Sequence, residues 1–175
     1  DGARLFTAAC ALVLEARQLA ACAESVAFNL NKGLGAPLGA ILAGPADFIS
    51  DAVRVRQMFG GGWSPAGILA AAGIVALEGM ISRLADDHAR ARALAEGLAA
   101  LNGIEVDPNL VDSNIVLARP TEAAPETVAE GLIGEGVLVL PFGPYLRLVT
   151  HHEFTDADAD VTLPAFGAVL EGVGR

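Results

Sequence analysis

The first hundred residues are dominated by apolar runs, and their spacing predicts helices arranged around one short hairpin. Residues 4–14 are apolar and Ala-rich enough for a buried helix. Residues 25–30 and 38–43 are apolar runs typical of buried strands. About seven residues separate the two strands, which is too few for a helical crossover, so we predict an antiparallel hairpin.

A second set of helices is predicted after the hairpin. Pro45 and Asp47 suit the first turn of a helix that runs to about Met58. The glycines at 60–62 end it. Ser64 is then expected to cap a further helix with Pro65 at its first position. That helical pattern continues to about Leu101, with a kink near Gly79.

The pattern changes after Gly103 to short strands and short helices. The strand candidates are residues 104–106, 114–118, 137–140 and 146–150, and the helix candidates are residues 125–134 and 156–173. This order predicts a small α+β domain over residues 101–175, preceded by residues 1–100 with the long helix at their end. The whole chain is therefore predicted to be α/β.

Composition narrows the classes of function. The 175 residues carry a net charge of −10, so no basic surface is available for nucleic acid. The longest apolar run, residues 66–77, is too short and too interrupted by glycine to span a bilayer, and no signal peptide is recognisable. Cys10 and Cys22 do not form a disulfide framework and indicate reduced thiols in a cytoplasmic protein.

The chain opens on Asp1, without a methionine, and runs directly into Gly-Ala-Arg-Leu-Phe. This start is typical of the middle of a longer protein, so we expect the chain to be a fragment.

Lys32 is the strongest candidate for chemistry. It is the only lysine in the chain, and it lies between a strand-like run and the sequence Gly33-Leu34-Gly35. A strand end followed by a glycine-rich loop can hold one amine in a cavity, where it can attack a carbonyl carbon. The alternative is an ordinary solvated surface charge.

Two further motifs place single charged residues in unusual settings. Asp1 and Arg4 lie three residues apart at a loop-to-helix junction, where the carboxylate could hold a protonated ring nitrogen. They could equally be a turn aspartate and a surface arginine. Arg147 lies between apolar strand residues and suits a carboxylate through its two-pronged geometry. The alternative is an edge-strand arginine that faces water.

Metal binding is not predicted. The acidic residues 156, 158 and 160 imitate the start of a calcium loop, but Val161 and Gly167 stand where glycine and glutamate are needed. Thr155 and Asp158 instead form a capping-box pattern at the start of a helix.

Taken together, these motifs resemble the low-specificity L-threonine aldolases, within the β-eliminating lyase group of fold-type I pyridoxal phosphate enzymes. The stretches that carry the resemblance are Asp1-Gly-Ala-Arg-Leu, Lys32-Gly-Leu-Gly-Ala-Pro-Leu-Gly, Gly60-Gly-Gly, Ala70-Ala-Ala-Gly-Ile-Val-Ala-Leu-Glu, Leu84-Ala-Asp-Asp-His-Ala-Arg-Ala-Arg and Arg147-Leu-Val-Thr-His. They follow the family's order along nearly the whole chain. The fold implied is the C-terminal part of a fold-type I enzyme: part of the large, cofactor-binding domain and the small C-terminal domain.

The resemblance also implies roles for individual residues. Lys32 would bind pyridoxal 5′-phosphate covalently, and Asp1 would keep the pyridine nitrogen protonated. Arg4 would help to position cofactor and substrate, and Arg147 would bind the substrate carboxylate. The implied reaction is the retro-aldol cleavage of a β-hydroxy-α-amino acid, such as threonine, to glycine and an aldehyde. The complete enzyme would be a cytoplasmic homo-oligomer, a dimer or tetramer, that binds neither nucleic acid nor membrane.

The sequence departs from the family at three places. Trp63-Ser64-Pro65 stands where members have Met-Arg-Gln, so an arginine near the cofactor phosphate or the subunit contact is missing. Asn31 replaces a common serine. The phosphate loop and the ring-stacking histidine of the N-terminal half are not found in the chain. Two alternatives follow: another fold-type I lyase that acts on aromatic β-hydroxy amino acids, and a non-catalytic remnant.

Overall fold

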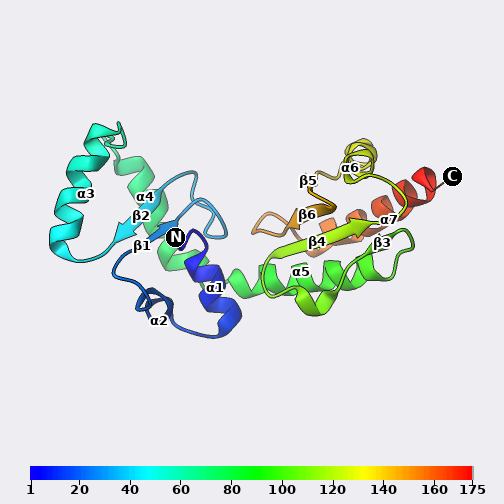
Figure 1. The fold of residues 1–175 in the computed structure, drawn as a ribbon, viewed down its shortest axis with the longest axis horizontal. Coiled ribbons are helices and arrows are strands. Elements are labelled where there is room, and N and C mark those ends of the chain that lie inside the picture. The colour runs from blue at the N-terminus through cyan, green and yellow to red at the C-terminus, as the bar shows by residue number, and fades with distance from the viewer. Residues whose placement is uncertain (175) are drawn as a thin grey trace. The chain divides into compact units, whose positions relative to one another are not determined.

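The computed structural model describes residues 1–174, which form two compact units that divide between Leu84 and Ala85 (Figure 1). Each unit has its own cluster of buried apolar side chains. The sequence predicts a domain boundary near residue 100. The contacts instead group the helix over residues 84–99 almost entirely with the second unit, because Leu94 and Leu98 of that helix are buried in the second core. The functional domains at 1–100 and 101–175 stay a prediction.

The first unit is built around the predicted hairpin. β1 (Val26–Asn29) pairs antiparallel with β2 (Ala40–Ala43), in a register that sets Val26 opposite Ala43 and Asn29 opposite Ala40. α1 (Leu5–Leu12) precedes the hairpin and packs against it through Phe6, whose ring meets Phe28 edge-on at 5.3 Å. The hairpin prediction is confirmed.

Four more helical segments belong to the first unit. They are α2 (Ala16–Ala20), α3 (Ala46–Met58), α4 (Gly67–Val75) and a π-helical turn over Ala76–Met80. Leu30, Leu34, Ala36, Ala76 and Leu84 form the buried cluster of this unit. The sequence did not predict α2. This helix has only five residues and none of them is buried, so it has no apolar face that a pattern could reveal.

The expected helix cap at Ser64 is wrong. α4 begins at Gly67, and its first backbone hydrogen bond runs from the amide of Ala70 to the carbonyl of Ala66. Ser64 therefore lies outside the helix and caps nothing. The single long helix is also interrupted, because the π-helical turn and residues 81–83 separate α4 from α5 (Leu84–Ala99).

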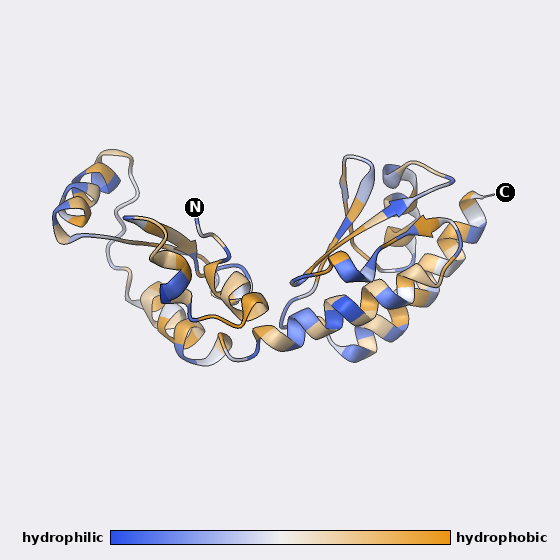
Figure 2. Ribbon diagram, turned by 60° about the horizontal axis from the view of Figure 1, so that its bottom comes forward, coloured by the Kyte–Doolittle hydropathy of each residue, from blue (hydrophilic) through white to orange (hydrophobic). Residues whose placement is uncertain are grey.

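The second unit is a four-stranded antiparallel sheet in the order β3-β4-β6-β5, with helices packed against its core side. The strands are β3 (Ile104–Glu105), β4 (Ile115–Pro120), β5 (Leu140–Phe142) and β6 (Tyr145–Val149), and the helices are α5, a 3₁₀ turn (Pro108–Leu110), α6 (Pro125–Gly134) and α7 (Asp156–Val173). Figure 2 shows hydrophilic and hydrophobic residues alternating around the long helix α5. The apolar side of that helix joins Val128, Leu132 and Phe166 in the core.

Two local predictions in this unit had different outcomes. Thr155 and Asp158 form the predicted capping box, in which the Thr155 amide donates to Asp158 Oδ2 at 2.7 Å. The strand expected at 137–140 is displaced to Leu140–Phe142. The amide of Val137 donates to the carbonyl of Leu132 at the end of α6. Pairing with β6 therefore begins further along the chain, at Leu140.

No single helix within residues 1–174 is long and apolar enough to cross a membrane, while one bent pair, Gly67–Met80 with Leu84–Ala99, passes on length and composition only.

Candidate functional site

The segment Asp1–Ala3 lies along the free edge of β1. The amide of Gly2 donates to the carbonyl of Ala27 at 2.8 Å, and the amide of Asn29 donates to the carbonyl of Ala3 at 3.3 Å. This approach needs glycine, because a Cβ atom on Gly2 would lie 2.8 Å from Val26 Cγ2 and 3.2 Å from the Ala27 carbonyl oxygen. The start of the chain is therefore held beside the strand that leads to Lys32.

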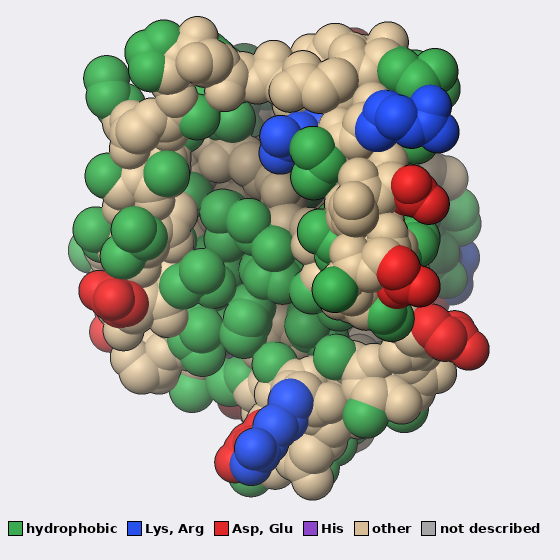
Figure 3. Space-filling model, turned by 90° about the vertical axis from the view of Figure 1, so that its left-hand side faces the viewer, with side chains coloured by type: hydrophobic (Ala, Val, Ile, Leu, Met, Phe, Trp, Pro, Cys, Tyr) green, Lys and Arg blue, Asp and Glu red, His purple; other side chains and the backbone are tan. Residues whose placement is uncertain are grey.

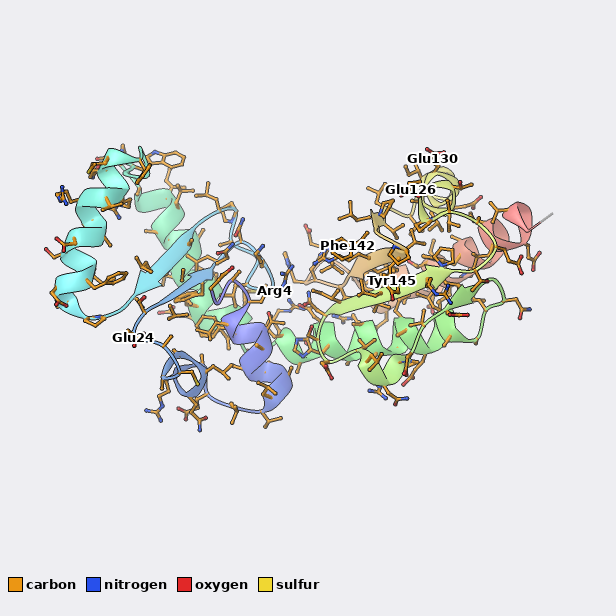
Figure 4. All side chains as sticks on the ribbon, in the orientation of Figure 1. Arg4, Glu24, Glu126, Glu130, Phe142 and Tyr145 are labelled. Atoms are coloured by element: carbon orange, nitrogen blue, oxygen red, sulfur yellow. The ribbon has the colours of Figure 1, made fainter. Side chains whose placement is uncertain are left out.

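Asp1 and Arg4 take defined positions at this edge. The Asp1 carboxylate accepts a hydrogen bond of 2.9 Å from the amide of Ala3. The carbonyl of Gly2 accepts from the amide of Leu5 at 2.7 Å, so Arg4 lies directly before α1 (Figure 4). Both Asp1 and Arg4 line a cavity of about 370 Å³.

The loop that carries Lys32 is closed by backbone hydrogen bonds. The amide of Leu30 donates to Gly39 at 2.9 Å, and the amide of Ala36 donates back to Leu30 at 3.0 Å. A turn within the loop joins the amide of Gly35 to the carbonyl of Lys32 at 2.9 Å, and Gly35 adopts a φ of +72° there. Lys32 is half-buried, and Gly33 and Leu34 after it are buried. The lysine therefore projects from a loop with little freedom.

Arg4 and Lys32 line the same small cavity, together with Thr7 and Asn29. Asp1 does not line that cavity, but it shares the larger one with Arg4. Arg4 therefore lines one cavity with Lys32 and another with Asp1, so it lies between these two residues in the site.

Thr7 is a residue of this site that the sequence did not reveal. It is 4% exposed, and its Oγ1 would lie 3.2 Å from a Cβ atom on Gly33. A larger side chain at position 33 would also meet Leu84 Cδ2 at 2.9 Å. No local signal in the sequence marks Thr7, because its place beside Gly33 depends on how α1 packs against the hairpin loop.

Arg147 lies in the second unit, on the sheet face opposite the core. Its neighbours Leu146 and Leu148 are buried, so Arg147 projects from the other side of β6. The register sets it between Leu117 of β4 and Leu140 of β5, which are 42% and 56% exposed. Phe142 and Tyr145 are paired one step along the same face (Figure 4).

Two arginines on this face differ in their partners. Arg119 forms an ion pair with Glu105 of the neighbouring strand. Arg147 makes no ion pair with any residue in the described part of the chain. A guanidinium between leucines without a carboxylate is an available site for an anion.

The fold of this chain is that of the fold-type I pyridoxal phosphate enzymes. A solved structure described as a putative L-allo-threonine aldolase from Listeria monocytogenes aligns with a TM-score of 0.80 and 21% identity, over 97% of this chain and 51% of that one. A structure of SPT with PLP aligns with a TM-score of 0.69 and 25% identity, over 91% of this chain and 43% of that one.

The sequence comparisons define the family. The beta-eliminating lyase model matches residues 1–121, and the chain belongs to that family. It is 38% identical over 170 residues to low-specificity L-threonine aldolase 1 of Arabidopsis thaliana, covering 95% of this chain and 48% of that protein. It is 39% identical over 151 residues to the low-specificity L-threonine aldolase of Escherichia coli K12, covering 86% and 44%. The chain spans about half the length of the relatives it matches.

Pyridoxal phosphate is the cofactor that this family and fold imply. The residues around Lys32 fit it: a half-buried amine on a constrained loop, an arginine in the same cavity, and a carboxylate in the cavity next to it.

Proposed function

We propose that this chain is the part of a pyridoxal phosphate-dependent aldolase that holds the cofactor through Lys32. The complete enzyme would cleave threonine, allo-threonine or a related β-hydroxy-α-amino acid to glycine and an aldehyde. The observation that carries the proposal is the closeness of the chain's one lysine to Arg4, which lines the same small space of about 10 Å³, in a member of the beta-eliminating lyase family.

Each residue would contribute a separate task. Lys32 would hold the cofactor covalently and would release it when the amino group of the substrate takes its place. Asp1 would hold the pyridine nitrogen in its protonated form, and Arg4 would orient cofactor and substrate. Pyridoxal phosphate, when bound, accepts the electron pair that is released as the Cα–Cβ bond breaks. The proton lost from the β-hydroxyl is balanced by the proton gained at Cα.

Arg147 would bind the substrate carboxylate. Its guanidinium has no acidic partner among the described residues and is bordered by apolar side chains, so a carboxylate there would form a charge-assisted pair. Two-pronged binding of this kind also fixes the orientation of the α-carbon.

Thr7 would have a supporting part. Its buried hydroxyl lines the cavity next to Gly33, where it could accept or donate a hydrogen bond as Lys32 exchanges its partner. We further propose, as the sequence predicts, that the complete enzyme is a cytoplasmic homo-oligomer.

The test is covalent trapping. The chain is incubated with pyridoxal phosphate, reduced with borohydride, digested and mapped by mass spectrometry. The cofactor label is expected on Lys32. The amine of the N-terminus is the rival site, and a label found there and not on Lys32 would refute the proposal. The variant Lys32→Arg keeps the charge and should lose the label, while threonine cleavage by the complete enzyme should fall to background.

A further inference from the structure

Thr150 is a buried polar residue that directly follows β6, the strand that carries Arg147. Side chains alternate along this strand, so Leu146 and Leu148 point into the core and Arg147 points away from it. Thr150 continues the inward series and is 1% exposed. It lies only three residues from Arg147, so a displacement of Thr150 would move the strand segment that carries the guanidinium.

Three hydrogen bonds hold Thr150 in place. Its hydroxyl donates to the backbone carbonyl of Asp87 in α5 at 2.6 Å. Its amide donates to the carbonyl of Asn114 at 3.1 Å, and its own carbonyl accepts from the side-chain amide of Asn114 at 2.7 Å. All three residues are buried. Because hydrogen bonds are stronger in the interior than in water, these three determine where the end of β6 lies.

The two bonds with Asn114 also fix the register of β6 against β4. Val149 pairs with Ile115 in the ladder, so Thr150 and Asn114 are the next pair beyond it. A shift of one residue would turn Arg147 toward the core, because side chains alternate along a strand. The doubly bonded pair at the end of the ladder therefore keeps Arg147 on the sheet face opposite the core.

The hydroxyl bond attaches β6 to the helical turn at which the chain leaves the first unit. α5 begins at Leu84, which is 1% exposed, and a Cβ atom on Gly33 of the lysine loop would lie 2.9 Å from Leu84 Cδ2. Asp87, three residues further along the same turn, accepts the hydroxyl of Thr150. The first turn of α5 thus packs against the lysine loop through one residue and holds the strand of Arg147 through another.

We propose that Thr150 is a positioning residue for Arg147, whose guanidinium it holds where the substrate carboxylate binds. The inference rests on the proposed function, in which Arg147 binds that carboxylate. Thr150 acts through Arg147, because its bonds to Asp87 and Asn114 fix β6 and so the direction of the two-pronged guanidinium. A misplacement of about 1 Å can cost about 100-fold in rate, so a loosened strand end should be visible in the kinetics.

The test uses the complete enzyme and a set of threonine variants. Thr150→Val keeps the shape of the side chain and removes the hydroxyl, whereas Thr150→Ser keeps the hydroxyl. Thr162→Val is the matched control. Thr162 is also buried in the second unit, and its hydroxyl also donates to a backbone carbonyl, that of Asp158, at 2.7 Å. That bond lies within α7 and does not involve β6.

The measurements are KM and kcat for threonine, together with the amount of cofactor label on Lys32 after borohydride reduction. Thr150→Val should raise KM about three- to tenfold with little change in kcat, because binding of the carboxylate is weakened. Thr150→Ser should stay close to wild type, and Thr162→Val should leave KM unchanged. Loss of folded enzyme would lower kcat and the label without changing KM, so a merely structural role is distinguishable.

A double variant shows whether Thr150 acts through Arg147. When Thr150→Val is added to Arg147→Lys, KM should rise by less than about twofold beyond the single Arg147→Lys variant. An unchanged KM in Thr150→Val, an equal rise in Thr162→Val, or a full further rise in the double variant would overturn the inference and leave the proposed function standing. An unchanged KM in Arg147→Lys would instead refute the carboxylate role of Arg147, and the inference with it.

Discussion

The hydroxyl of Thr150 donates a hydrogen bond of 2.6 Å to the backbone carbonyl of Asp87, and both residues are buried. Thr150 directly follows β6, and Asp87 lies in the first turn of α5. Asn114, directly before β4, donates its side-chain amide to the Thr150 carbonyl at 2.7 Å, and its backbone carbonyl accepts from the Thr150 amide at 3.1 Å. These three bonds join the end of β6, the strand of Arg147, to the start of β4 and to the first turn of α5.

Replacing Thr150 by valine should therefore destabilise the second unit. Valine keeps the shape but removes this hydrogen bond, whose net contribution to stability is about 0.5–1.5 kcal/mol. Thr150→Ser retains the hydroxyl and should lose less. Urea unfolding followed by circular dichroism measures both, and equal losses for valine and serine would show that the methyl group, not the hydrogen bond, matters.

Arg147→Lys should impair the complete enzyme more than Arg119→Lys. Lysine keeps the charge at position 147 but cannot bind a carboxylate in two-pronged fashion, so KM for threonine should rise strongly and kcat/KM should fall, by about tenfold or more. Arg119 already pairs with Glu105, so its substitution is the matched control on the same sheet face. Steady-state kinetics at saturating cofactor gives both values. Unchanged kinetics in Arg147→Lys would make Arg147 a surface residue only.

Stability should fall as the pH drops below about 6.5, through His88. Burial lowers the pKa of His88 from its usual 6.5, against the smaller opposing effect of the Asp87 charge, and its Nε2 is buried without a hydrogen-bond partner. Below about pH 6.5 the unfolded chain takes up a proton that the folded chain resists, so the free energy of unfolding declines until the pH reaches the folded-state pKa. Unfolding of the wild type and of His88→Gln from about pH 7.5 to about pH 5 tests this. The variant should lose less stability over that range, and parallel curves would exclude His88 as the cause.

The chain of 175 residues by itself is expected to associate and to lack aldolase activity. Its first unit has only a two-stranded sheet, which is marginal alone, and all four residues of β2 are exposed. The outer edge of β2, which pairs with no further strand in the described chain, and the exposed Ile68, Ile74 and Val75 of α4 favour association. Figure 3 shows hydrophobic side chains gathered on the side of the first unit where α3 lies. Light scattering and an assay of glycine release from threonine, both with cofactor present, are the measurements. A monodisperse chain with the activity of its relatives would contradict this expectation.

Much of the secondary structure could be predicted from sequence because its signals are local. α6 and α7 begin and end where the pattern predicts, since Pro125 occupies the first turn of one and the Thr155–Asp158 capping box starts the other. The hairpin followed from the short distance between its strands. Lys32 and Arg147 stand out as candidates in the sequence alone, because Lys32 is the single lysine beside a glycine-rich loop and Arg147 lies between apolar strand residues.

Other features depend on contacts between distant residues, and only the tertiary structure decided them. The interruption after α4 falls at the π-helical turn Ala76–Met80, which contains the predicted kink position, Gly79. No local signal, however, records that α5 packs its leucines into the second core. Thr7 reaches the Lys32 loop because α1 packs against the hairpin, although the two segments are well separated along the chain. Arg119 and Arg147 have similar strand patterns, but the pairing of β3 with β4 gives Arg119 a carboxylate and leaves Arg147 without one among the described residues. Sequence alone determines which residue types and local elements are present, whereas the partner of a charged side chain depends on strand register and packing.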